Sequence, residues 1–104
     1  MTLEDRRLKL HEALCAILGS RHVYYDPPES IAMKYPAIVY SKARINDAFA
    51  DNKKYLGKVS YEGTLIRKDD DDDILDRILE LPYTTFGRAF TSSNLHHDTF
   101  TTFI

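Results

Sequence analysis

The chain has 104 residues, 43% of them hydrophobic, with seven Tyr and five Phe, a composition typical of one folded domain with a single modest core. No run of about 18 apolar residues occurs, and the charged N-terminal stretch lacks the apolar centre of a signal peptide, so we expect neither a membrane span nor a signal sequence. The single cysteine, Cys15, cannot form an internal disulfide, which suits a reducing compartment.

The formal net charge of -2 is unevenly distributed along the chain. Residues 1–68 carry twelve Lys or Arg against eight Asp or Glu, a net +4, whereas residues 69–104 carry two against eight, a net -6. This asymmetry indicates a surface that selects partners, including copies of the chain stacked head to tail. The chain as a whole lacks the strong basic excess that is typical of proteins that coat DNA.

The first predicted element is a helix over residues 3–18, preceded by Thr2 as N-cap and followed by Gly19 at its C-terminal end. Its apolar residues fall near one face at helical spacing. They are Leu3, Leu10, Leu14, Ile17 and Leu18. An extended segment at residues 22–25 and a proline-containing loop at 26–30 follow.

Two long strands are predicted next, over residues 36–45 and 55–67, because apolar and polar residues alternate in both. Gly57 and Gly63 predict a bulge or bend in the second strand. The polar run at residues 46–54 is predicted to be a turn. Because it joins two long strands, we expect it to project toward a partner.

A second helix is predicted over residues 72–81, followed by strands near residues 86–90 and 97–104 with a turn at 91–94. The resulting order is α-β-β-β-α-β-β. Long strands without helical crossovers favour an α+β domain over residues 1–104. We expect a mostly antiparallel sheet of four to five strands with two helices on one face.

No residue pattern indicates an enzyme or a cofactor. The five aspartates at residues 69–73 lack the spacing of a calcium loop, so we interpret them as an acidic helix start and a patch that repels or selects partners. His11 and Cys15, four apart on a helix, are too few for a zinc site. His96 and His97 point to opposite faces of a regular strand. Catalytic nucleophile and phosphate-loop motifs are absent.

One alternative is a small sheet domain that binds nucleic acid. Basic residues interleaved with aromatic residues on a sheet can follow a phosphate backbone and stack on bases. The candidate residues are Lys42, Arg44, Lys53, Lys54 and Lys58, with Tyr40 and Tyr55 among them.

A series of short motifs runs in order along most of the chain. They are Tyr24-Tyr25-Asp26-Pro27-Pro28, Tyr35-Pro36-Ala37-Ile38-Val39-Tyr40, Leu81-Pro82-Tyr83, Phe86-x-Arg88-x-Phe90-Thr91, Asn94-Leu95 and His97-Asp98-x-Phe100-Thr101. In this order they resemble the tail-completion, or tail-terminator, proteins of long-tailed phages that infect Gram-positive bacteria. Proteins of this family are also described as head–tail joining or minor capsid proteins.

The resemblance implies a ring, expected to hold six copies, that closes the head-proximal end of the tail tube and contacts the tail tube protein and the head connector protein. Genomic DNA would pass through the lumen without sequence-specific contact. The resemblance also implies a place in the neck of the virion, after assembly in the host cytoplasm, and no membrane partner. Our candidate subunit or partner contacts are Asp47, Asp51, Lys53, Lys54, Asp71, Asp72, Phe100 and Phe103.

Overall fold

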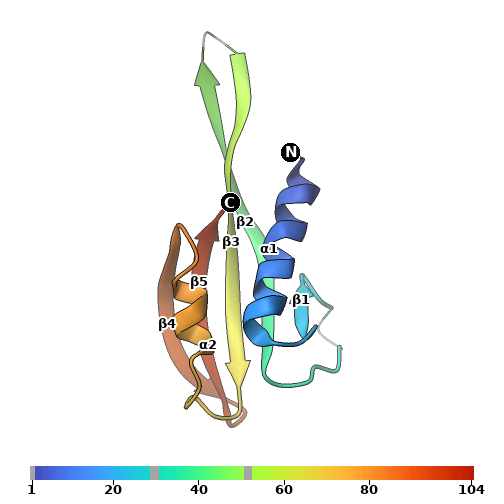
Figure 1. Ribbon diagram of the computed structural model, residues 1–104, viewed down its shortest axis with the longest axis vertical. Helices are drawn as coiled ribbons and strands as arrows, with labels where there is room; N and C mark the ends of the chain where they lie inside the picture. Colours follow the sequence, from blue (N-terminus) through green and yellow to red (C-terminus); the bar gives the residue numbers. More distant parts are fainter. Residues whose placement is uncertain (1, 29–30, 51–52) are drawn as a thin grey trace.

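The computed structural model describes residues 2–28, 31–50 and 53–104, with side chains described outside residues 45–57. Two helices and five strands follow the predicted order α-β-β-β-α-β-β, and the predicted α+β class is confirmed (Figure 1). The elements are α1 (Leu3–Leu18), β1 (Val23–Tyr25), β2 (Ala37–Ala50), β3 (Lys53–Arg67), α2 (Ile74–Leu79), β4 (Thr84–Ser92) and β5 (Leu95–Phe103).

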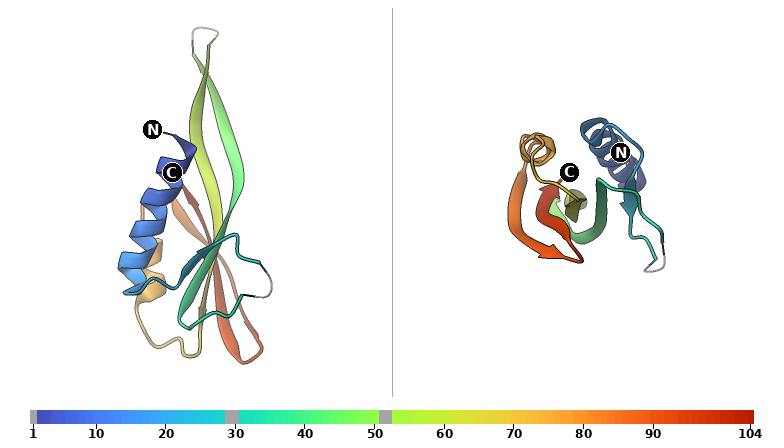
Figure 2. Two further views of the ribbon diagram at one scale, coloured as in Figure 1. Left: turned by 90° about the vertical axis from the view of Figure 1, so that its right-hand side faces the viewer. Right: turned by 90° about the horizontal axis from the view of Figure 1, so that it is seen from below.

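The five strands form one sheet in the spatial order β1-β2-β3-β5-β4. The short β1 pairs parallel with β2, and the other three pairings are antiparallel. The sheet therefore consists of two hairpins, β2–β3 and β4–β5, joined where β3 pairs with β5, with β1 added at the outer side of β2. Both helices lie on the same face of this sheet, as expected (Figure 2).

Local sequence signals fix the ends of α1. The Thr2 hydroxyl accepts the N–H of Asp5 at 3.1 Å, and the Asp5 carboxylate accepts the N–H of Thr2 at 3.1 Å, which satisfies two donors of the first turn. Gly19 adopts a φ of 79°, the left-handed conformation that ends many helices. The predicted N-cap and C-terminal glycine are thus confirmed.

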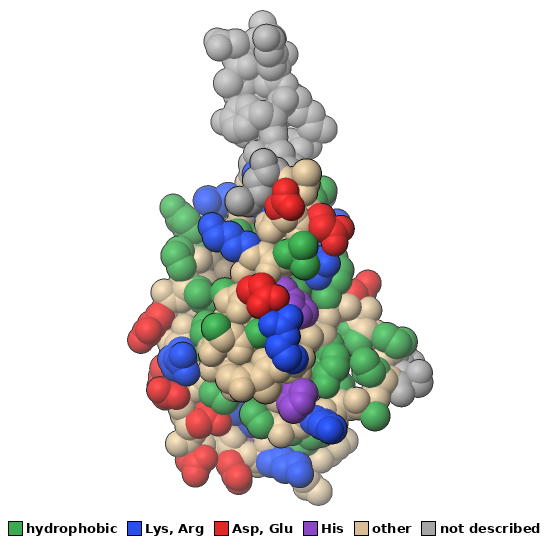
Figure 3. Space-filling view, turned by 45° about the vertical axis from the view of Figure 1, so that its right-hand side comes forward, with side chains coloured by type: hydrophobic (Ala, Val, Ile, Leu, Met, Phe, Trp, Pro, Cys, Tyr) green, Lys and Arg blue, Asp and Glu red, His purple; other side chains and the backbone are tan. Residues whose placement is uncertain are grey.

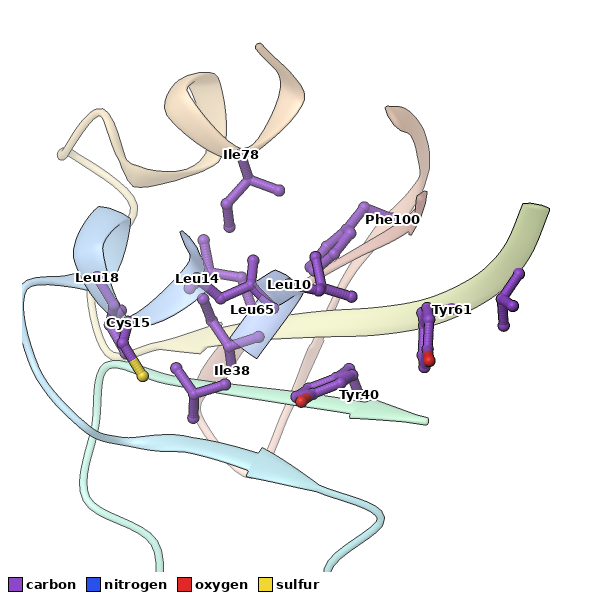
Figure 4. Close-up of a cluster of buried hydrophobic side chains, with 12 residues drawn as sticks. Leu10, Leu14, Cys15, Leu18, Ile38, Tyr40, Tyr61, Leu65, Ile78 and Phe100 are labelled. Atoms are coloured by element: carbon purple, nitrogen blue, oxygen red, sulfur yellow. The ribbon is translucent and has the colours of Figure 1, made fainter. Parts of the chain in front are cut away.

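The core lies between the helices and the sheet (Figure 4). Leu14 of α1 and Ile78 of α2 pack above Ile38 and Leu65 of the central strands, and all four side chains are fully buried. The predicted alternation in β3 is confirmed in part: Val59, Tyr61 and Leu65 are buried while Lys58 and Glu62 are exposed, but Ser60, predicted on the polar side, is buried as well.

Gly63 serves close packing rather than the bulge that the sequence predicted. The ring of Phe100, its direct partner on β5, lies against the Gly63 backbone where any Cβ would collide with the ring. One register shift lies on β2, between Lys42 and Arg44. At the other, Ile45 pairs with Val59 and Asp47 with Leu56, so two residues of β3, Gly57 and Lys58, lie opposite one residue of β2, which agrees with the irregularity predicted at Gly57. Phe100 is only 2% exposed, so the expectation that it contacts a partner is corrected: it is a core residue.

The β2–β3 hairpin is longer than predicted. Strand β2 continues to Ala50 and β3 begins at Lys53, so most of the predicted turn at residues 46–54 is paired strand. Asn, Asp and Lys are weak strand formers mainly because they gain little from packing on a half-buried surface. Here the two strands continue the pairing that begins in the body of the sheet.

Helix α2 is shorter than the predicted range of residues 72–81. Asp72 lies outside the helix, because its carboxylate accepts the N–H of Ile74 at 3.1 Å, a local bond that competes with helical pairing. The second predicted turn is also tighter than residues 91–94. Ser93 and Asn94 alone join β4 to β5, with φ values of 53° and 62°, as in a type I′ hairpin turn.

Candidate assembly surfaces

The outer half of the β2–β3 hairpin extends beyond the rest of the fold (Figure 1). We call residues 45–50 and 53–58 the arm. The last pair between β3 and the C-terminal strand is Val59 with Ile104, joined by two hydrogen bonds of 2.9 Å, and β1 pairs with β2 only as far as Tyr40. Within the described strands, the arm therefore pairs only with itself. Its two outer edges are templates for further strand pairing.

Three of the candidate contact residues lie on the arm. Asp47 pairs with Leu56, Lys54 with Phe49, and Lys53 with Ala50. The fourth candidate in this region, Asp51, lies outside the described residues. The backbone thus brings Asp47, Lys53 and Lys54 together on one projecting element.

The acidic segment, residues 69–73, is exposed at the end of the fold away from the arm. Acidic side chains gather there in Figure 3. Asp71 is exposed, whereas Asp72 accepts a hydrogen bond from Arg67 at 2.5 Å in addition to the N–H of Ile74. The interpretation of a helix start therefore holds for Asp72. No group of three or more His, Cys, Asp or Glu within the described part of the chain is placed to hold a metal ion.

Arg67 anchors the acidic segment to the sheet. Its side chain is 5% exposed and also donates to Asp98 of β5 at 2.7 Å. Burial alone would lower the pKa of Arg67, but the hydrogen bonds to Asp98 and Asp72 outweigh burial and raise it. The guanidinium thus stays charged and fixes the position of residue 72 relative to β5.

Strand β4 forms a long exposed edge of the sheet. Phe86 is 46% exposed, Phe90 is 38% exposed, and Tyr83 just before the strand is 65% exposed. Phe90 stacks on His97 with ring centroids 4.8 Å apart. Exposed aromatic residues on an edge strand are typical of contact surfaces. The alternation of Phe86 and Phe90 predicted a strand, but not its place at the edge of the sheet, which depends on pairing with β5.

The sheet face opposite the helices carries a shallow groove of about 500 Å³. Threonines from β3 and β5 line much of it, with Glu62 on one strand and Arg88 on β4. The hydroxyl, carboxylate and guanidinium groups of this lining can form hydrogen bonds with a partner.

Three residues of the nucleic-acid alternative whose side chains the structure describes, Tyr40, Lys42 and Arg44, do not share one exposed face. Tyr40 is only 2% exposed, and its hydroxyl lies 2.7 Å from Nδ1 of His11, so its ring is not available to stack on a base. Lys42 lies opposite Tyr61 while Arg44 lies opposite Ser60, because of the register shift in β2. Residues paired in this way share a face, so Lys42 and Arg44 lie on opposite faces of the sheet.

Phe103, the last candidate contact residue, is half-buried beside a pocket of about 290 Å³ at the C-terminal end of β5.

Neither helix of the described chain is long and apolar enough to cross a membrane. Comparison of the sequence with models of known protein families gives no match, and comparison with curated proteins gives none either.

Proposed function

We propose that this chain is a structural subunit of the neck of a long-tailed phage. In this proposal, copies of the chain form a ring that closes the head-proximal end of the tail tube and joins it to the head connector, and DNA passes through the lumen. The proposal combines the resemblance of the sequence motifs to tail-terminator proteins with the surfaces described above. It requires contacts between proteins and no chemical reaction.

The observation that carries the proposal is the arm. A two-stranded hairpin is at best marginally stable in water without a third strand or a packed face. The arm has no third strand on either side within the described fold, and its backbone extends past both helices (Figure 1). A hairpin of this kind gains stability when a partner covers it, which favours a protein whose working state is an assembly.

Two further features support assembly with copies of the same chain. The β4 edge offers exposed aromatic residues for a second interface. The acidic segment and the arm lie at opposite ends of a molecule whose longest dimension is 52 Å, so unlike surfaces can meet head to tail. Head-to-tail contacts between identical subunits close into a ring when the rotation at each interface permits it.

The test is to measure the mass of the purified chain in solution, by light scattering and by imaging of single particles, alone and with preassembled tail tubes. We expect rings, and tubes that carry a ring at one end and stop growing. A variant in which the arm is replaced by a two-residue turn after Arg44 provides the control, and we expect it to remain folded and fail to cap tubes.

A chain that stays monomeric at every concentration and leaves tube growth unchanged would overturn the proposal. Titration with a short oligonucleotide addresses the alternative function. Tight binding that weakens steeply with salt would favour a nucleic-acid module instead, whereas a flat titration agrees with passage of DNA without sequence-specific contact.

A further inference from the structure

A small polar pocket lies between the first half of α1 and the strands β1 to β3. We call it the Arg7 pocket, and its lining residues are Leu3, Glu4, Arg7, Tyr25, Lys42 and Tyr61. Its volume of about 150 Å³ is well below the roughly 300–1,000 Å³ of pockets for drug-sized ligands, so it suits one small side chain. Two of the lining residues are cations and two are phenols, which are groups that donate hydrogen bonds to a carboxylate.

The Arg7 pocket already holds one carboxylate, that of Glu4. The guanidinium carbon of Arg7 lies 4.6 Å from the centroid of the Tyr25 ring, and the guanidinium donates to a carboxylate oxygen of Glu4 at 3.0 Å. The Glu4 side chain is 70% exposed, so this ion pair is weak and can exchange for another carboxylate. Lys42 is exposed and supplies a second cation. Burial raises the pKa of Tyr61, so its hydroxyl stays protonated.

The acidic segment offers a carboxylate in a fixed position. Its Asp72 is held by the buried Arg67, whereas the neighbouring Asp71 is exposed. Because residue 72 is anchored, little conformational freedom of the backbone is lost when Asp71 is bound. The five aspartates repel one another, and Arg67 and Lys68 together offset at most two of their charges. A cationic partner therefore stabilises this segment.

The acidic segment lies too far from the Arg7 pocket of its own copy to enter it. Tyr61 lines the pocket and Arg67 anchors the segment, and the two residues are six positions apart on β3. At about 3.3 Å per residue this separation is roughly 20 Å. Because Arg67 also holds Asp72, residue 71 stays near its own end of the strand. A carboxylate from this segment can therefore enter the pocket only from another copy.

A nucleic-acid backbone is a less suitable occupant than a single carboxylate. Lys42 and Arg44 lie on opposite faces of the sheet because of the register shift in β2. The described cations of β2 therefore do not form a row that successive phosphates could follow. One carboxylate needs only the Arg7 guanidinium and the Lys42 ammonium.

We propose that the Arg7 pocket receives the carboxylate of Asp71 from a second copy of this chain, between Lys42 and Arg7, where it replaces Glu4 as the partner of Arg7. The contact is heterologous, since each copy provides one pocket and one acidic segment, and it can therefore continue from copy to copy around a ring. This inference rests on the self-assembly in the proposed function and identifies one contact between neighbouring copies.

The test compares the self-assembly of variants by mass measurement in solution, after circular dichroism and thermal unfolding have established that each is folded. We expect Lys42→Glu and Asp71→Lys each to raise the concentration needed for half-assembly about tenfold, because each change places like charges together. The two changes combined should recover most of this loss. Lys9→Glu is the matched control, since Lys9 is an exposed lysine of α1 outside the pocket lining, and it should raise the concentration by less than about threefold.

The variant Glu4→Gln tests the exchange of carboxylates at Arg7. It removes the carboxylate that Asp71 must displace, so the concentration needed for half-assembly should fall about threefold. A higher concentration than that of the unaltered chain would contradict the exchange.

Carbodiimide cross-linking of the unaltered chain identifies the contact directly. The reagent joins a lysine amine to a carboxylate that lies against it, and we expect a link between Lys42 and Asp71, identified by mass spectrometry of peptides. If no such link forms and Lys42→Glu assembles like Lys9→Glu, the contact is overturned while the ring can still stand. If the unaltered chain neither assembles nor caps tubes, both the contact and the proposed function are overturned.

Discussion

Arg67 is held between two carboxylates that come from different parts of the chain. Asp98 is 10% exposed on β5, and Asp72 is 36% exposed just before α2. Removing one partner from a buried ion pair leaves a charge that water cannot solvate, whereas the same change at a partly exposed pair costs much less. The two contacts to Arg67 should therefore contribute unequally to stability.

We expect Asp98→Ala to lower the free energy of unfolding by about 3 kcal/mol and Asp72→Ala by about 1 kcal/mol or less, as measured by urea denaturation. Asp70→Ala, an exposed aspartate of the acidic segment, is the control and should change stability by no more than about 0.5 kcal/mol. Equal losses for Asp98→Ala and Asp70→Ala would show that the buried pair does not stabilise the fold.

His11 is a second residue whose surroundings affect stability. Burial lowers its pKa below the usual 6.5, and the charges of Arg21 and Arg7 lower it further. An unfolded chain therefore takes up a proton at His11 at a higher pH than the folded chain. The stabilising contribution is present above about pH 6.5 and is lost as the pH falls toward the depressed folded value.

We expect the thermal stability to fall as the pH is lowered from about 6.5 to about 5. The change in stability with pH should be smaller in His11→Gln, which keeps a polar group near the Tyr40 hydroxyl. Titration of the folded chain by NMR should give a His11 pKa below 6.5. A value at or above 6.5 would contradict this prediction, as would an unchanged slope in His11→Gln.

At the residue scale, the sequence could indicate alternation along a strand but not the partner across the sheet. It predicted that adjacent His96 and His97 face opposite ways, yet it could not predict that Asp98 meets Arg67, because that contact depends on the register between β3 and β5. Phe100 could not be assigned to the core for the same reason, since its position is set by Gly63 on another strand.

At the element scale, most of the fold could be predicted from local patterns. The ends of α1 follow from Thr2 and Gly19, whose preferences depend only on neighbouring residues. The arm could not be predicted, because its polar sequence resembles a turn and only continued pairing between two strands makes it extended. Asp47, Lys53 and Lys54, predicted as contact residues, lie on the arm, and their role in contacts stays a prediction. The sequence did not predict that β4 is an exposed edge of the sheet.

The turn between β4 and β5 allows a test at this scale. Ser93 has a φ of 53°, a conformation that costs most residues about 1–2 kcal/mol and that Asn tolerates better. We expect Ser93→Asn to raise the free energy of unfolding by about 0.5 kcal/mol, seen as a higher urea midpoint with an unchanged slope. Ser92→Asn, in the strand, is the control and should not stabilise. A lower midpoint for Ser93→Asn would contradict the assignment of the turn.

At the scale of the whole molecule, the two parts of the chain differ in charge, with a net +4 over residues 1–68 and -6 over residues 69–104. Attraction between unlike ends of neighbouring copies is screened as the Debye length shortens from about 10 Å at 0.1 M salt to about 3 Å at 1 M. Self-association measured by sedimentation should therefore weaken over this range. In the variant with Asp69, Asp70 and Asp71 changed to Asn, self-association should depend less on the salt concentration. Self-association that strengthens with salt would contradict an electrostatic contribution.

The joining of two hairpins at the β3–β5 pairing also has a consequence for folding kinetics. Strands β2 and β3 are neighbours in sequence, as are β4 and β5, so each hairpin closes a short loop and can form rapidly. Pairing β3 with β5 must close a longer loop and bring Phe100 onto Gly63 and Asp98 onto Arg67. We therefore expect formation of the β3–β5 pairing to limit the folding rate. Substitutions in the two edge strands, β1 and β4, should change mainly the rate of unfolding.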